Sequence, residues 1–298
     1  MKGGMILFVC TACLSLPVLA APLSVKDDLG ISVTLDRPAQ RIISLAPHAT
    51  EMLFAVGAGS RIVGAVDFSN YPEAAKAIPR VGGYHRLDVE RIVNLKPDLV
   101  IAWRDGNGPP AIDRLKKLRL NVYVTEPVDL PDVASHLRRL SVLVGEEETG
   151  QAVAARFQVR YEGLKQRYEN ARPVSTFYQL WHQPLMTATN SHLIGQVIRL
   201  CGGANIFADL PVPTPKVGLE AVLAADPRAI IASGMDEARP EWLDDWRQWP
   251  KLRAVSNNHL FFVAPDILQR HSPRILDGAD QVCAALDQVR SARGDRKH

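Results

Sequence analysis

The stretch from Gly150 to Asn170 most constrains what this chain can fold into. Five apolar side chains recur in it at steps of three and four residues, with charged and polar residues between them: Val153, Phe157, Tyr161, Leu164 and Tyr168. That period predicts an amphipathic helix. Glu147 and Glu148 suit the positive end of its dipole, and Pro173 cannot continue it. At about 1.5 Å per residue, the helix would span roughly 30 Å, the width of a small domain.

Two similar segments stand on either side of this helix. Glu90–Trp103 and Glu220–Ser233 both begin with an acidic residue, continue as a short apolar helix, turn at a proline and end in a buried strand. We therefore predict an α/β fold: two Rossmann-like lobes with mainly parallel sheets, joined by a single long α-helix. The expected divisions are an N-terminal lobe at 21–145, a connecting helix at 146–171 and a C-terminal lobe at 172–298. A helical joiner limits hinge bending, whereas paired loops would permit wide closure.

The N-terminus predicts export. Residues 1–20 have the features of a signal peptide, because Lys2 precedes an apolar run from Met5 to Leu19 and the small residue Ala20 suits the cleavage site. The run is too short for a transmembrane helix. We expect a mature chain that begins near Ala21 and works in the periplasm. The 35 Lys and Arg residues against 32 Asp and Glu are mixed along the chain, which argues against a nucleic-acid surface.

Two cysteines, Cys201 and Cys283, remain after the predicted cleavage. In an oxidising compartment they predict a disulfide, and the alternative is two buried thiols. A bridge would close a loop of roughly 80 residues, worth ~4 kcal/mol on a chain-entropy model. Neither cysteine has a Cys or His at ligand spacing, so the sequence gives little support to a metal site or a nucleophile there.

The expected ligand site lies where the parallel strands end, because such sheets bind ligands outside the carboxyl ends of their strands. The residues there are aromatic and polar: Pro47, His48, Tyr71, Trp103, Arg104, Trp181, His182, Asp266 and Arg270. In the helix that follows Pro47, Thr50 is the expected N-cap and Glu51 the expected first-turn acid. Ser272 and Pro273 are the expected start of the terminal helix.

Four histidines fall in or near loops that face the expected cleft: His48, His85, His182 and His271. Imidazole is a ligand for zinc or haem iron, although most loop histidines are simply solvated. The sequence has no nucleophile elbow, phosphate loop or paired-ligand helix motif. An enzyme is the alternative to a binding protein. An exported hydrolase or metal enzyme would need convergent groups with perturbed pKa values.

From about Arg41 to Arg290, the chain resembles the vitamin B12 (cobalamin)-binding proteins of ABC importers. These belong to the helical-backbone (class III) periplasmic solute-binding proteins, which also carry haem and iron–siderophore. The most specific segments are Ser69–Pro72, Glu90–Arg104, Cys201–Phe207 and Arg270–Arg274. Ala-Trp-Arg followed by Asp-Gly-Asn, with both cysteines matched, points to the cobalamin members.

The resemblance implies a ligand wall of Tyr71, Tyr84 and Trp103 from the first lobe and of Asp266 and Arg270 from the second. Close relatives are more aromatic at the positions of Leu180, Met186 and Thr214, and we expect Trp181 to compensate. The resemblance also implies that the ligand is a corrinoid, that the protein has no resident cofactor or metal and no catalytic activity, and that it is a monomer when free. A haem or iron–siderophore carrier is the alternative within the same fold.

The resemblance also implies that Glu90 and Glu220, one in each lobe, dock onto arginines of an ABC importer permease. The simpler alternative is that each glutamate only stabilises the first turn of its helix.

Overall fold

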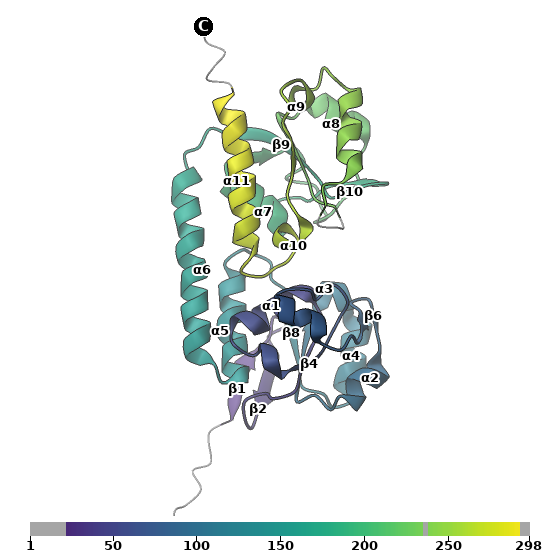
Figure 1. Ribbon diagram of the computed structural model, residues 1–298, viewed down its shortest axis with the longest axis vertical. Helices are drawn as coiled ribbons and strands as arrows, with labels where there is room; N and C mark the ends of the chain where they lie inside the picture. The colour runs from purple at the N-terminus through teal and green to yellow at the C-terminus, as the bar shows by residue number, and fades with distance from the viewer. Residues whose placement is uncertain (1–21, 235–237, 293–298) are drawn as a thin grey trace, which may run out of the picture.

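The computed structural model describes residues 22–234 and 238–292, which form two lobes beside one long helix (Figure 1). The predicted signal peptide, residues 1–20, lies outside them. Each lobe has a four-stranded parallel sheet. The N-terminal order is β4 (Ile62–Ala65), β3 (Ile42–Ser44), β7 (Leu99–Trp103), β8 (Val122–Thr125). The C-terminal order is β12 (Gly203–Asn205), β9 (Val174–Gln179), β13 (Ala229–Ala232), β14 (Leu260–Phe262). The predicted fold class is confirmed.

The strands are parallel and central because their sequences are apolar on both faces. Four residues of β7 and all four of β13 are buried, which is typical of strands covered by helices on both sides. The helices of the N-terminal lobe are α1 (Pro47–Ala55), α2 (Val89–Asn94), α3 (Arg104–Asn107), α4 (Pro109–Lys117) and α5 (Asp132–Val144). Those of the C-terminal lobe are α7 (Leu193–Leu200), α8 (Leu219–Ala225), α9 (Arg253–Ser256), α10 (Pro265–Leu268) and α11 (Ile275–Ser291).

Short elements complete the lobes. Three antiparallel pairs are β1 (Leu23–Lys26) with β2 (Ser32–Leu35), β5 (Gly82–Gly83) with β6 (Arg86–Leu87), and β10 (Trp181–His182) with β11 (Leu185–Met186). Three 3-10 turns cover Gly59–Arg61, Glu73–Ala77 and Glu241–Gln248. None of the described helices is long and apolar enough to cross a membrane.

The long helix predicted around 150–170 is α6 (Glu147–Tyr168), which runs alongside both lobes (Figure 1). Its N-terminal half lies against α5, where a Cβ on Gly150 would come within 2.1 Å of the Ser141 hydroxyl, so glycine permits this close approach. Its C-terminal half is tied to α11. There Arg160 Nη2 donates to Asp277 at 2.8 Å and to Asp280 at 2.9 Å.

One apolar core extends through both lobes and α6. It includes Met52 of α1, Ile101 of β7, Leu137 of α5, Phe157 of α6 and Val282 of α11. A smaller apolar cluster lies on the other face of each sheet, one in the N-terminal lobe and one in the C-terminal lobe. Separating the lobes would expose part of the shared core to water, so the core resists hinge bending.

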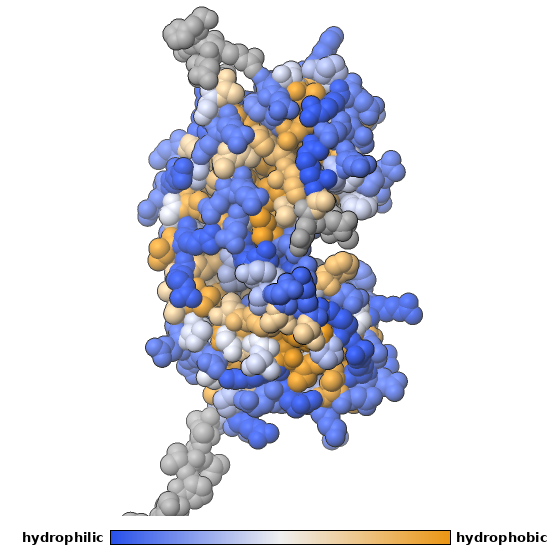
Figure 2. Space-filling model, viewed as in Figure 1, coloured by the Kyte–Doolittle hydropathy of each residue, from blue (hydrophilic) through white to orange (hydrophobic). Residues whose placement is uncertain are grey.

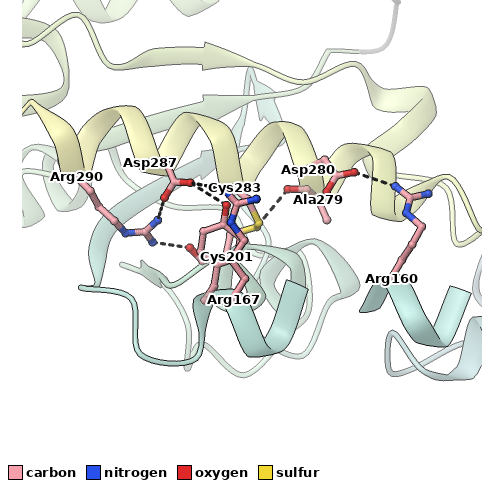
Figure 3. Close-up of a disulfide and its surroundings, with 9 residues drawn as sticks. Arg160, Arg167, Cys201, Ala279, Asp280, Cys283, Asp287 and Arg290 are labelled. Carbon is pink, nitrogen blue, oxygen red and sulfur yellow. Dashed lines mark hydrogen bonds and ion pairs between the residues drawn. A yellow bond between two sulfur atoms is a disulfide. The ribbon is translucent and has the colours of Figure 1, made fainter. Parts of the chain in front are cut away.

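The predicted disulfide is present between Cys201, which follows α7, and Cys283 of α11, with Cα atoms 4.7 Å apart. Beside it, Arg290 Nη2 donates to the Cys201 carbonyl at 2.5 Å, and Arg290 Nη1 pairs with Asp287 at 2.6 Å (Figure 3). The terminal helix is thereby fixed onto the C-terminal lobe.

Two helix starts differ from the prediction. Thr50 is not an N-cap: α1 begins at Pro47, and the buried Thr50 hydroxyl donates to Ser44 Oγ at 2.8 Å. Glu51 is buried within the helix rather than exposed in its first turn. The terminal helix begins at Ile275 instead of Pro273, although Ser272 Oγ still accepts from the Arg274 amide at 3.3 Å. Thr50 is held by Ser44 and Ser69 of its own lobe, whereas the Ser272 hydroxyl donates to Glu51 of the other lobe.

Candidate functional site

A pocket of 270 Å³ lies between the lobes, where β7 and β14 lead into α3 and α10. Figure 2 shows the surface indented between the lobes on the side away from α6. The N-terminal lobe contributes Pro47, His48, Phe68, Tyr84, His85 and Trp103. The C-terminal lobe contributes Pro265, Asp266, Gln269, Arg270 and His271. Of the predicted ligand residues, the structure therefore brings Tyr84, Trp103, Asp266 and Arg270 together.

The aromatic wall of the N-terminal lobe is held by Asn107, which sequence reasoning missed. Its side-chain oxygen accepts from the Trp103 amide at 2.7 Å, and its nitrogen donates to the Tyr84 carbonyl at 2.7 Å and the Leu45 carbonyl at 2.9 Å. The rings of Tyr84 and Trp103 lie 5.7 Å apart. A Cβ on Gly106 would come within 1.9 Å of the Trp103 ring, so this glycine leaves room for the indole. The signal was present in the Asp-Gly-Asn run after Trp103.

The polar wall depends on a buried carboxylate from the opposite lobe. Glu51 of α1 accepts from Arg270 Nη1 at 2.8 Å, Arg274 Nη1 at 3.1 Å and the Ser272 hydroxyl at 2.5 Å. Arg270 also pairs with Asp266 at 2.6 Å. The Glu51 side chain is 2% exposed, so both its oxygens are satisfied by the other lobe rather than by water. Nothing in the local sequence around Glu51 signals this contact.

Three histidines lie between the lobes beside Trp103. The His271 ring is 5.5 Å from that of His48 and 5.8 Å from that of His192, and the His48 ring is 5.4 Å from the Trp103 ring. Burial lowers the pKa of His48 to about 3 and the pKa of His192 to about 4. Burial, reinforced by the neighbouring histidines, also lowers the pKa of His271 well below its usual value. All three imidazoles are therefore neutral at pH 7.

Four other predicted residues lie outside the pocket lining. Tyr71 is 45% exposed and stacks under Arg274, whose guanidinium is 3.7 Å from the ring centroid. Arg104 is turned to Glu126, with which it pairs at 2.6 Å. Trp181 is in the β10–β11 hairpin and donates to the Gln183 carbonyl at 3.0 Å. His182 stacks on Trp242 with ring centroids 5.5 Å apart.

The described residues do not contain a cluster of three or more His, Cys, Asp or Glu side chains that could hold a metal ion. A second hollow, of 470 Å³, lies beside α6 and α7 and is lined by Tyr161, Lys165 and Arg199 among others. It contains none of the predicted ligand residues. The cleft between the lobes is therefore the candidate site.

Comparison with known proteins identifies the family. A family model described as periplasmic binding protein matches residues 42–267. The vitamin B12-binding protein of Vibrio cholerae serotype O1 is 39% identical over 250 residues, which cover 84% of this chain and 90% of that protein. This chain belongs to the periplasmic binding protein family. The predicted periplasmic location is confirmed with it.

Solved structures give the same fold. The periplasmic vitamin B12 binding protein BtuF of Vibrio cholerae has a TM-score of 0.78 and 38% identity, covering 85% of this binding protein and 98% of that chain. The periplasmic heme-binding protein RhuT from Roseiflexus sp. RS-1 has a TM-score of 0.76 and covers 84% of this chain and 99% of its own. Its identity of 21% shows a shared fold alone.

The buried histidines predict a pH dependence. Because the folded-state pKa values of His48 and His192 lie near 3 and 4, the unfolded chain binds more protons between those values and about 6.5. The free energy of unfolding should therefore be highest above about pH 6.5 and fall on acidification toward pH 4, by up to about 1.4 kcal/mol per pH unit for each neutral histidine. Urea denaturation at several pH values measures it. His271→Gln removes one of these titrating groups, so the free energy of unfolding of the variant should fall less steeply with decreasing pH than that of the wild type. The same slope in both proteins from pH 6.5 to 4.5 would contradict the prediction.

Proposed function

We propose that this binding protein captures a corrinoid in the cleft between its lobes and delivers it to the permease of an ABC importer, without chemical change. The observation that carries the proposal is the pairing of an aromatic wall, Tyr84 and Trp103, with a carboxylate–guanidinium wall, Asp266 and Arg270. Such a pocket suits a flat macrocycle with amides at its edge. The rings offer apolar faces to the macrocycle, and the charged groups offer acceptors and donors to its amides.

The resemblance at 39% identity to a vitamin B12-binding protein supports the choice of ligand. The lining of the cleft carries one acid, one arginine and neutral imidazoles, and these described residues include no nucleophile paired to a base, so we propose binding without turnover. Tyr71, Arg104 and Trp181, which lie outside the pocket lining, remain proposed contacts for the outer parts of a large ligand.

A haem carrier is the second candidate, and His85 is the observation that favours it. Its exposed imidazole lines the pocket and lies 3.9 Å from the Tyr84 ring, within reach of a bound ligand. Imidazole is a ligand of haem iron. Solved haem-binding structures share this fold.

Calorimetry separates the two candidates. We expect one equivalent of cyanocobalamin to bind per chain. Trp103→Ala should weaken binding by about 2 kcal/mol or more, roughly thirtyfold, because it removes a large aromatic contact from the centre of the site. Trp249→Phe, at a partly buried indole packed against the core of the C-terminal lobe and outside the pocket lining, is the control and should leave the affinity unchanged. Saturable binding of haem with no heat from any corrinoid would replace the first candidate by the second.

We further propose that Glu90 and Glu220 dock onto the permease. Both are exposed in the first turn of a short helix, α2 and α8, and Figure 1 shows these helices on different lobes, away from α6. Asp88 caps α2 by accepting from the Arg91 amide at 2.9 Å, which leaves Glu90 without a capping duty. Two exposed carboxylates held at a fixed separation can set the register of a charged interface and increase the rate at which the binding protein meets the permease.

Glu90→Ala with Glu220→Ala should leave cyanocobalamin affinity unchanged and weaken permease association, with a smaller dependence on salt. Each exposed first-turn glutamate contributes only about 0.3–1 kcal/mol to stability, so the variant should fold. Glu147→Ala with Glu148→Ala makes the same charge change in the first turn of α6 and should associate like the wild type. Vesicles containing the permease provide the assay. Equal association by all three proteins would leave the glutamates as dipole partners only.

A further inference from the structure

The N-terminal lobe carries a cluster of cations at the end of its sheet opposite the cleft. The cations lie near the starts of β3, β7 and β8, in the segments 41–42, 93–98 and 113–121. These segments contain six Lys and Arg residues against two carboxylates, Asp98 and Asp113. Five of the six cations are exposed and the other is half-buried. We call these six residues the basic end patch: Arg41, Lys96, Arg114, Lys116, Lys117 and Arg119.

Strand pairing and hydrogen bonds bring the three segments of the patch together. Asn121 Nδ2 donates to the Asp98 carbonyl at 3.0 Å. The Arg41 guanidinium donates to the Leu95 carbonyl at 2.7 Å and to the Lys96 carbonyl at 3.2 Å. The helices α2 and α4 pack against the same apolar cluster, and Figure 1 shows them on the same side of the lobe. The basic end patch is therefore one surface built from segments that are distant in sequence.

The positive charge of the patch is not balanced by neighbouring carboxylates. Within the described part of the chain, none of the six cations makes an ion pair. Asp98 accepts from the backbone instead, from the Gln40 amide at 2.8 Å and the Arg41 amide at 2.9 Å. In the other lobe, by contrast, the exposed Arg253 pairs with Asp226 at 2.7 Å. The patch therefore has a net positive potential, which attracts an anionic partner.

The internal repeat shows that the fold does not require these cations. Lys96 follows α2 at a φ of 46°, and the equivalent residue of the second repeat, Asp226, follows α8 at a φ of 42°. Arg119 comes after α4 at a φ of 60°. Glycine or asparagine is the usual residue at such a left-handed position. A cation there suits the negative end of the helix dipole, but the carboxylate in the second lobe shows that the dipole does not dictate the residue.

Two apolar side chains are exposed in the same segments. Leu118 is 47% exposed between Lys117 and Arg119, and Val93 of α2 is 40% exposed. Cations around an exposed leucine suit a membrane surface, because the apolar side chain enters the headgroup region while the charged groups pair with phosphates. A nucleic acid would use the charges and leave the leucine in water. The surface therefore favours a bilayer as its partner.

We propose that the basic end patch binds the surface of an anionic phospholipid bilayer, with Leu118 inserted among the headgroups. Glu90 is in the first turn of α2 and Lys96 follows the last turn, roughly 9 Å further along the helix axis. A lobe that rests on the bilayer through the patch would hold Glu90 near a membrane-embedded permease and confine the search for it to the membrane plane. This contact goes beyond the proposed function and does not depend on which ligand the cleft binds.

Vesicle flotation tests the contact with the exported protein. We expect the wild type to float with vesicles of phosphatidylcholine and phosphatidylglycerol in equal parts at low salt, and to be released as the salt concentration rises. It should remain in solution with vesicles of phosphatidylcholine alone.

A triple variant, Lys96→Asn with Lys117→Gln and Arg119→Asn, removes three charges, and asparagine tolerates the left-handed backbone at 96 and 119. Each lost charge should lower the partition coefficient about fivefold, the factor of about 1 kcal/mol for each basic residue at an anionic surface. Leu118→Ser should lower it about fourfold without changing the salt dependence.

Arg156→Gln with Arg199→Gln and Lys251→Gln is the matched control. It makes the same charge change at three exposed cations outside the patch and should float like the wild type. All variants should keep the cyanocobalamin affinity of the wild type, so a failure of the bilayer contact is distinguishable from a failure of the proposed function.

Three results would overturn the proposal. A wild type that does not float with anionic vesicles, or a triple variant that floats equally well, would leave the cations as dipole partners, and urea denaturation of the triple variant would then measure that role. An equal loss in the matched control would show attraction by net charge rather than by the patch. Flotation only with phosphatidylcholine vesicles that contain the permease would assign the patch to the permease instead.

Discussion

The buried carboxylate of Glu51 is the interaction on which the arrangement of the two lobes most depends. It is almost fully buried, and its partners Arg270, Arg274 and Ser272 all come from the other lobe. An unpaired buried charge is costly, so moving the lobes apart would break the ion pairs or require water to enter. The shared core and α6 also hold the two lobes together. We conclude that the cleft is largely built before a ligand arrives.

The fixed arrangement of the two lobes explains where the candidate site lies. Parallel strands bring polar loops together at their carboxyl ends, and two lobes facing each other turn those ends into opposite walls of one cleft. The N-terminal wall is aromatic because β7 ends in Trp103, which Asn107 and Gly106 hold in place. The C-terminal wall is charged because Asp266 of α10 pairs with Arg270, which lies four residues later in the turn after the helix. A fixed cleft also holds Glu90 and Glu220 at a steady separation, as docking to a two-fold partner would require.

Local periodicity was sufficient to predict much of the fold. The period of 150–170 predicts α6, and the repeated helix–proline–strand segments predict the two parallel sheets, because local propensity and tertiary packing agree there. Prediction failed where a side chain makes a buried tertiary contact. Thr50 and Glu51 look like a helix start in sequence, and Ser272 looks like a cap. Thr50 instead bonds to Ser44 within its own lobe, and Glu51 bonds to Arg270 and Ser272 of the other lobe. Contacts between residues some 220 positions apart leave no local pattern.

The most direct test of the fixed arrangement of the lobes is the distance between them with and without ligand. Nitroxide labels at Glu90→Cys and Glu220→Cys place one probe on each lobe, since Cys201 and Cys283 are joined to each other. The account predicts that pulsed electron paramagnetic resonance finds a narrow distance distribution whose mean moves by less than about 2 Å when cyanocobalamin saturates the exported protein. A broad distribution that narrows on binding, or a mean that moves well beyond that range, would show lobes that close on the ligand and would contradict it.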